Sequence, residues 1–500
     1  MKLLTGEAQR GPLISSVIVL ASLTVLTLTV VTYSTVKVAA PVLAIVVLLA
    51  VAHKQLLAWR TLLGLTIAII LFIPIRRYSL PASLPIQLEP YRVMVALVAT
   101  VWVTALLIDP RVRLRRSGLE VPIAVFLLAI LGSLLANPKR VEETNSFVVK
   151  GVTFFLSFVI VFFLVVSLAR KAREIDFLTR LLAGGGAILA LSAIVESRTH
   201  YNVWNHLQGV VPILDFKSGA AENLGDLRRG GRLRVYASAQ HPIALGAALA
   251  MLIPLALYRA QAFRQKRWWL ITVALLMGVL ATRSRTAIMM LAAIALVYLL
   301  LRPTQVKRFW PALLPALIAI HLVLPGTLGS LRNSFFPAGG LIAQQTEQKV
   351  GSGRLATLGP ALDKEFKPNP ILGEGYSTRI THAEPNFPRP NAPITDDGWL
   401  SILLETGLVG AVALVWLFFR ALRRMGGTAK RDFSPRGWFL TAITASVAAF
   451  GVGMFTYDAF SFIQVTFLLF IVLGIGMAAL RTSQFEWHSL AAKQPASGGP

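Results

Sequence analysis

Residues 354–410 read RLATLGPALDKEFKPNPILGEGYSTRITHAEPNFPRPNAPITDDGWLSILLETGLVG. This segment is polar and rich in proline, glycine and charge, and it ends with two adjacent acids, Asp396 and Asp397, at the mouth of an apolar run. Apolar runs on both sides are long enough to cross a bilayer. In a chain that is mostly membrane, such a segment is the largest water-exposed piece, so we expect function there.

The apolar runs around this segment decide the fold class. The 500 residues are 55% hydrophobic and only 14% charged, whereas soluble domains carry roughly 25% charged residues. The runs are continuous and about 16 to 22 residues long, which suits helices crossing a hydrocarbon core of about 30 Å. They do not alternate as the strands of a membrane barrel do. We therefore predict an all-α, polytopic integral membrane protein with about 12–14 transmembrane helices and a large extracytoplasmic loop.

The expected spans divide the chain into an N-terminal region, 1–200, a catalytic membrane region, 201–480, and a disordered cytoplasmic tail, 481–500. The first apolar run is longer than the usual signal-peptide core of about 7 to 15 residues, so we interpret it as a retained helix. The expected spans lie near 13–32, 38–52, 59–75, 91–108, 119–135, 147–168, 177–196, 241–258, 267–282, 285–301, 309–326, 398–419, 437–455 and 459–480.

The charge distribution predicts the orientation in the membrane. The formal net charge is +26, and the short loops 111–116, 169–180, 258–269, 302–308 and 420–436 carry the excess of Lys and Arg, which places them in the cytoplasm. Both termini are then cytoplasmic, and loops 197–240 and 327–397 face outward. The sequence shows no basic, aromatic-rich domain outside the membrane segments, so it does not favour nucleic-acid binding. The chain has no cysteine, which excludes disulfides and thiol catalysis.

Arginines gather on the predicted outer face, where the positive-inside rule does not explain them. Arg232 and Arg234, preceded by 228–229, stand before one span, and Arg283 and Arg285 flank a tight link between two spans. The guanidinium fork matches phosphate oxygens bidentately. Anchoring to lipid headgroups is the alternative interpretation.

Three expected helix starts coincide with these motifs. His241 is followed by proline, which favours the first helical turn, Ser284 can cap a second helix, and residues 395–397 can cap a third. Helix N-termini suit an anion. Arginines and helix starts are therefore expected to converge on one anionic group.

The paired acids have two interpretations. Asp397 before a helix is an ordinary N-cap, and Asp396 is then available as a general base. His241 and His382 are the other outer-face bases, although a loop histidine such as His382 is usually only solvated. No spacing of His and acids predicts a metal site, and we expect no cofactor.

Three further residues support this site. Gly373 and Gly375 predict a tight turn with close backbone approach. Glu405 lies inside an apolar span. Placing an acid there costs free energy, so we take such an acid as a functional residue. We expect it to face protein, to pair with an outer arginine, or to position a cation or the acceptor.

The motifs together resemble those of the O-antigen ligase and O-antigen polymerase superfamily, which includes exopolysaccharide polymerases. The likeness rests on RLRVYASAQHPIALGAALAMLIPLAL (232–257), LATRSRTAIMMLAAIAL (280–296), PILGEGYS (370–377) and TDDGWLSILLETGLVG (395–410). The likeness covers about residues 228–410, and the first seven expected spans match only as generic membrane helices.

The resemblance implies a GT-C-like, inverting, metal-independent glycosyltransferase of the bacterial inner membrane. Its donor would be an undecaprenyl-pyrophosphate-linked glycan, with pyrophosphate held by Arg232 or Arg234 and Arg283 or Arg285. Ligases of the family usually carry His before Asn where this chain has Asp396 and Asp397. That difference makes Asp396 the expected base, favours polymerisation of exopolysaccharide over ligation to lipid A-core, and leaves a chain-length regulator as a possible partner.

Two other functions compete with this one. A transporter or flippase of lipid-linked glycans would place its polar groups near the bilayer midplane, whereas the charges here gather at the outer edge. A membrane scaffold would not need clustered outer arginines.

Overall fold

The computed structural model describes residues 59–81, 88–108, 113–217, 228–229, 232–306, 329, 332, 354–381 and 389–492. The expected spans 13–32, 38–52 and 309–326 and the candidate base His382 lie outside these residues. The chain divides into two compact units, residues 1–114 with 202–225, and residues 115–201 with 226–500.

The described residues are mainly helical, and the prediction of an all-α polytopic membrane protein is confirmed. Within the described part of the chain, five helices are long and apolar enough to cross a membrane, and a bent pair would make a sixth. Every expected span within the described residues has a helix at its position. Long apolar runs fix such helices because only intrahelical hydrogen bonds satisfy the backbone in hydrocarbon.

The smaller unit contains α3 (Trp59–Phe72) and α4 (Pro90–Ile108). Strand β1 (Tyr78–Ser79) pairs antiparallel with β2 (Asp215–Phe216), which follows the 3₁₀ helix η1 (Val203–Gly209). The Tyr78 hydroxyl donates to the Trp204 carbonyl at 2.9 Å. This unit therefore ties residues that follow the third predicted span to residues that follow the seventh.

The larger unit contains the functional motifs. Its first helices are α5 (Glu120–Ala136), α6 (Pro138–Glu143), α7 (Asn145–Leu168), α8 (Ala172–Thr199), α10 (Pro242–Ala262), α11 (Lys266–Ala281), α12 (Arg285–Leu301) and α13 (Pro303–Val306). They are followed by α17 (Arg354–Ala361), the π-helical turn η3 (Leu362–Phe366), α18 (Gly398–Arg431), α19 (Pro435–Gly453), the 3₁₀ turn η4 (Ala459–Ser461), α20 (Ile463–Ala479) and α21 (Gln484–Ala492). Strand β3 (Arg228–Arg229) pairs with β4 (Arg232–Leu233).

Helices α10 and α20 form the centre of this unit. All residues of α20 are buried, and α10 is buried along most of its length against α8, α11, α12 and α19. Small residues allow close packing between neighbouring helices. A Cβ at Gly278 of α11 would lie 2.8 Å from the Ala190 Cα of α8, so these two helices touch almost backbone to backbone.

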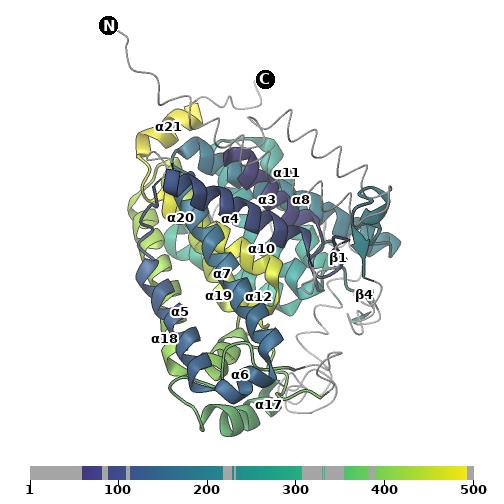
Figure 1. The fold of residues 1–500 in the computed structure, drawn as a ribbon. Coiled ribbons are helices and arrows are strands. Elements are labelled where there is room, and N and C mark those ends of the chain that lie inside the picture. Colours follow the sequence, from purple (N-terminus) through teal and green to yellow (C-terminus); the bar gives the residue numbers. More distant parts are fainter. Residues whose placement is uncertain are drawn as a thin grey trace. The chain divides into compact units, whose positions relative to one another are not determined.

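Helices α5 and α18 lie side by side, with α6 and α17 near one end of the pair (Figure 1). At the opposite end Arg420 donates to the Gly118 carbonyl at 2.6 Å and Arg424 to the Ser117 carbonyl at 2.7 Å. Helix α18 continues through Arg431, so most of the expected inner loop 420–436 is helical. The basic residues fall on a helix that continues past the expected span.

The expected disordered tail from residue 481 is also wrong where the structure describes it. Residues 484–492 form α21, and the Trp487 side chain is fully buried against Tyr258 and Phe439. Its indole N–H donates to the Thr482 hydroxyl at 2.7 Å. Burial of one large aromatic ring stabilises this segment, although the surrounding composition is polar.

Candidate functional site

The link between α11 and α12 and the strand leading to α10 hold each other through two arginines. Arg283 is buried, has a φ of 51°, and donates from Nη1 to the Leu233 carbonyl at 3.0 Å. Arg234, also buried, donates from Nε to the Thr282 carbonyl at 3.5 Å. We call residues 233–234 with 282–285 the arginine turn. The structure thus brings together two motifs about 50 residues apart in the chain.

The structure describes less of the other two candidate arginines, Arg285 and Arg232. Arg285 is the first residue of α12 and is partly buried. The backbone of Arg232 pairs with Arg229 between β4 and β3, and its side chain lies outside the described part of the chain.

The predicted helix starts are observed at all three positions. His241 precedes α10, and its Nδ1 accepts from the Ile243 N–H at 3.2 Å while its ring stacks on Phe462. Ser284 caps α12 by accepting from the Ala287 N–H at 3.4 Å. Asp397 caps α18 by accepting from the N–H groups of residues 399 and 400 at 2.9 and 3.1 Å. Each side chain satisfies a backbone donor that a helix start leaves open.

The loop between α19 and α20, residues 454–462, connects these helix starts. The Gly398 N–H donates to the Met454 carbonyl at 2.7 Å, which fixes the start of α18. Thr456 donates to the Thr286 hydroxyl at 2.8 Å, which fixes the start of α12. Gln240, beside His241, accepts from the N–H of Ile463 at 3.1 Å. The starts of α10, α12, α18 and α20 therefore lie at one end of the larger unit.

Sequence reasoning missed this loop. Its signal is Asp458, an acid in the short outer link between two expected spans. Asp458 accepts from the Ser461 hydroxyl at 2.5 Å. Burial raises the pKa of Tyr457 above its ordinary value, and the negative charge of Asp458 raises it further. An acidic position thus lies among the helix starts that the sequence singled out.

Helix α18 is interrupted at Gly407, whose φ of 64° and ψ of −166° are not helical. The segment 370–375 docks into this interruption. The N–H groups of Glu374 and Gly375 donate to the carbonyls of Leu404 and Glu405 at 2.9 and 3.1 Å. We call residues 370–375 with 404–409 the glycine break.

Glycine is required at two positions of the glycine break. Gly373 has a φ of 70°, and a Cβ there would lie 2.5 Å from the Gly407 nitrogen. A Cβ at Gly407 would lie 2.2 Å from the Ile371 carbonyl oxygen. Both positions combine a left-handed backbone with a close approach of another backbone, so only glycine fits without a shift. The tight turn expected at Gly373 and Gly375 is observed, with a φ of 107° at Gly375.

Glu405 lies in this break and is partly buried. Its carbonyl accepts from the Ser133 hydroxyl of α5, and its carboxyl interacts electrostatically with Arg379 and Asp458. Burial raises the pKa of Tyr376, and the Glu405 and Asp458 charges act in the same direction. Glu405 therefore faces protein, as expected, and it interacts with an arginine of the loop itself.

Two ion pairs hold the polar loop that leads from η3 to α18. Arg379 pairs with Glu365 at 2.6 Å, donates to the Pro393 carbonyl at 3.1 Å and reaches the Thr395 hydroxyl at 3.5 Å. Arg140 of α6 pairs with Glu374 at 2.6 Å. Burial raises the pKa of Glu374 above its ordinary value, and the positive charge of Arg140 only partly opposes this.

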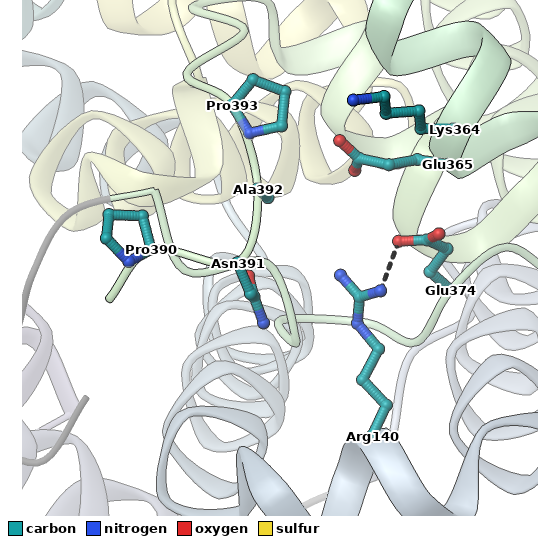
Figure 2. Close-up of a pocket in the computed structure, with 8 residues that line it drawn as sticks. All are labelled: Arg140, Lys364, Glu365, Glu374, Pro390, Asn391, Ala392 and Pro393. Carbon is teal, nitrogen blue, oxygen red and sulfur yellow. Dashed lines mark ion pairs between the residues drawn. The ribbon is translucent and has the colours of Figure 1, made fainter. Parts of the chain in front are cut away.

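A polar cavity of about 410 Å³ lies between these two ion pairs (Figure 2). Its lining comes from α6, from η3, from Glu374 of the glycine break and from residues 390–393. The lining residues are Arg140, Lys364, Glu365, Glu374, Pro390, Asn391, Ala392 and Pro393.

Asp396 differs from its neighbour Asp397. It has a φ of 46° and a partly buried side chain, while Asp397 is the residue that caps α18. Thr395, just before it, is buried and shares a hydrogen bond of 3.1 Å with Ser401. The backbone around Asp396 is therefore fixed from both sides, and its carboxylate is separate from the cap.

The family comparison covers this part of the chain. Residues 270–415 match the model of the family described as O-antigen ligase. This match supports membership of the O-antigen ligase and polymerase superfamily. The match includes most of α11, all of α12, the glycine break and Asp396, but not Arg234 or His241. No curated protein matches the chain.

The family match suggests a glycan-transferring enzyme, with a lipid-linked glycan donor and a setting in a bacterial membrane. The apolar helices agree with that setting.

Proposed function

We propose that this O-antigen ligase superfamily member joins glycans at the outer face of a bacterial inner membrane. An undecaprenyl-pyrophosphate-linked glycan donates its reducing end to a hydroxyl of a second glycan or lipid. The observation that carries this proposal is the gathering of the arginine turn and three capped helix starts at one end of the larger unit.

The arginine turn is suited to the leaving group. In the transfer, the bond from the anomeric carbon to the pyrophosphate oxygen breaks, and its electron pair leaves with the pyrophosphate. Arg234, Arg283 and Arg285, together with Arg232 and His241 from the approach to α10, would bind that charge. Preorganised cations and helix N-termini stabilise such developing charge without reorganising during the reaction. The scheme uses no metal ion.

Asp396 is the proposed base on the acceptor side. The acceptor oxygen attacks the anomeric carbon from the face opposite the departing pyrophosphate, which inverts the configuration, and its proton passes to the Asp396 carboxylate. A base must reach the attacking hydroxyl within about 2.6–3.2 Å. Because Asp397 is committed to the cap of α18, Asp396 is the acid of the pair suited to this role. His382 stays the second candidate.

Polymerisation of an exopolysaccharide is the preferred form of the reaction. The pair Asp396–Asp397 stands where ligases of the superfamily usually carry a His and an Asn. A glycan acceptor is therefore favoured over lipid A-core, with a chain-length regulator as a candidate partner.

The proposal is tested in cells that make the polymer. Asp396→Ala and Arg283→Ala should each shorten the polymer or abolish its synthesis at a normal protein level. Arg423→Ala, at an exposed position of α18 away from the helix starts, is the matched control and should leave the polymer unchanged. Normal chain length and yield in both site variants would refute the roles assigned to Asp396 and Arg283.

A further inference from the structure

The polar cavity of Figure 2 has no task in the transfer step proposed above. Its volume of about 410 Å³ falls within the range of about 300–1,000 Å³ usual for small-molecule sites. Its wall joins α6, η3 and both sides of the polar loop. A cavity of this size, built by three separate segments, has room for a ligand.

The charges around the cavity balance. Arg140 and Lys364 supply two cations, Glu365 and Glu374 supply two anions, and Asn391 supplies a neutral amide. A wall of this composition does not select an anion such as pyrophosphate. It offers both donors and acceptors at short range, which suits a ligand that carries many neutral hydroxyl groups.

The polar groups are held in place before any ligand arrives. The side chains of Glu374 and Glu365 are only 10% and 8% exposed, and their arginine partners lie at 2.6 Å. Figure 2 shows the Arg140 guanidinium directed at Glu374. Its buried Nη2 has no hydrogen-bond partner among the described residues. Such an unsatisfied buried donor is costly unless something accepts from it.

The lining amide is fixed in the same way. Asn391 Oδ1 accepts from the Ile380 N–H at 2.8 Å, and its Nδ2 donates to the Thr378 carbonyl at 3.0 Å. These two hydrogen bonds join Asn391 to the backbone of residues 378–380. The cavity wall therefore keeps one shape.

The cavity is also connected to the proposed base. Arg379 binds the lining residue Glu365 and the lining carbonyl of Pro393, and it reaches Thr395, the neighbour of Asp396. Pro393 and Asp396 are three residues apart, so their Cα atoms are separated by at most about 11 Å. A short oligosaccharide can span such a distance.

We infer that this cavity binds the acceptor glycan, holding a neutral sugar one or two units from the hydroxyl that reacts at Asp396. The inference rests on the proposed function and names the substrate class of its acceptor side. It assigns the selection of acceptor to Arg140, Lys364, Glu374 and Asn391, and leaves the pyrophosphate to the arginine turn.

Binding to the full-length protein in lipid nanodiscs tests this division. Two probes are used: neutral oligosaccharides released by mild acid from the polymer of the producing cells, and inorganic pyrophosphate. Lys364→Ala removes an exposed lining cation, and Ala392→Leu fills the cavity. Each should weaken oligosaccharide binding about tenfold or more, the loss expected when one charged hydrogen bond or the space for the ligand is removed.

Two controls make the result specific. Pyrophosphate binding should stay unchanged in both variants, which also shows that they are folded. Asp363→Asn alters an exposed ion pair on the same turn, outside the cavity lining, and should bind both probes as the wild type does. Failure of the wild type to bind the oligosaccharide, unchanged binding in both cavity variants, or weakened pyrophosphate binding instead would overturn the inference.

The same preparations separate this outcome from failure of the proposed function. Asp396→Asn should lose glycan transfer and still bind the oligosaccharide. Oligosaccharide binding that depends on the cavity, in a wild-type protein that transfers no glycan, would refute the enzyme and keep the binding site.

Discussion

The arginine turn and the glycine break both belong to the larger unit, yet they are held by different means. In the arginine turn, long side chains donate to carbonyls of the facing segment. In the glycine break, backbone meets backbone, and the side chains that would intervene are absent. Substitutions in the arginine turn should therefore lower the rate of glycan transfer more than the stability. Substitutions in the glycine break should lower the stability first.

The largest effect is expected at Asp396. Asp396→Asn should lower the rate of glycan transfer about 10²- to 10⁴-fold, because a positioned general base contributes that much. The melting temperature should stay near that of the wild type. Initial rates and thermal unfolding of the purified protein measure both.

Asp397→Ala supplies the contrast within the same dipeptide. Loss of an N-cap costs about 0.5–2 kcal/mol of stability, so this variant should unfold at a lower temperature and lose less activity than Asp396→Asn. If the two variants exchanged these behaviours, Asp397 would be the base and Asp396 a structural residue.

Arg283→Gln should have the next largest effect on rate. Removing one group that stabilises developing charge costs about 10²- to 10³-fold in turnover. The loss should appear together with weaker binding of inorganic pyrophosphate, which calorimetry measures. Full pyrophosphate affinity in this variant would remove the arginine turn from the leaving-group site.

Gly407→Ala tests the other region through stability. The left-handed φ and the contact of 2.2 Å with the Ile371 oxygen should together cost about 2–4 kcal/mol. Gly184→Ala in α8, where no heavy atom lies within 4 Å of the new Cβ, is the matched control and should be neutral or slightly stabilising. Equal melting temperatures for the two variants would contradict the packing described for the glycine break.

The smallest expected effect is a pH dependence at the edge of the glycine break. Burial raises the pKa of Glu374 above its ordinary value of 4.5, so the folded protein binds this proton more tightly than the unfolded chain does. Its contribution to stability is present below about pH 4.5 and is lost as the pH rises through the folded pKa. Glu374→Gln should therefore gain stability relative to the wild type as the pH rises.

Asp432 is a carboxyl whose pKa is shifted in the opposite direction from that of Glu374. Its burial would raise its pKa, but hydrogen bonds from Ser434 and Arg436 bring the pKa below the ordinary value of 3.8. Its stabilisation is lost as the pH falls, so Asp432→Asn should lose stability relative to the wild type as the pH rises. Thermal unfolding across the acidic range measures both slopes, and slopes of the same sign would contradict the account.

The sequence predicts the local features of this molecule well. Long apolar runs give the spans, and His241, Ser284 and Asp397 give the helix starts, because capping depends on a few neighbouring residues. The glycine pair at 373 and 375 signals a left-handed turn for the same local reason.

The partners of these features are not predictable in the same way. Arg140 pairs with Glu374 and Arg379 with Glu365 because tertiary packing sets them side by side. Asp458 marks the loop 454–462 in the sequence, but the backbone carbonyls and hydroxyls through which the loop joins the helix starts carry no distinctive pattern. The helix at 484–492 depends on one buried tryptophan, Trp487, that composition alone does not place.

The most direct test is the stoichiometry of transfer by the purified protein in proteoliposomes. The substrate is an undecaprenyl-pyrophosphate-linked oligosaccharide labelled in the glycan. The account predicts one new glycosidic bond for each undecaprenyl pyrophosphate released, in the wild type and not in Arg283→Gln or Asp396→Asn. Movement of the labelled lipid across the bilayer without new bonds would contradict the account and make the protein a transporter.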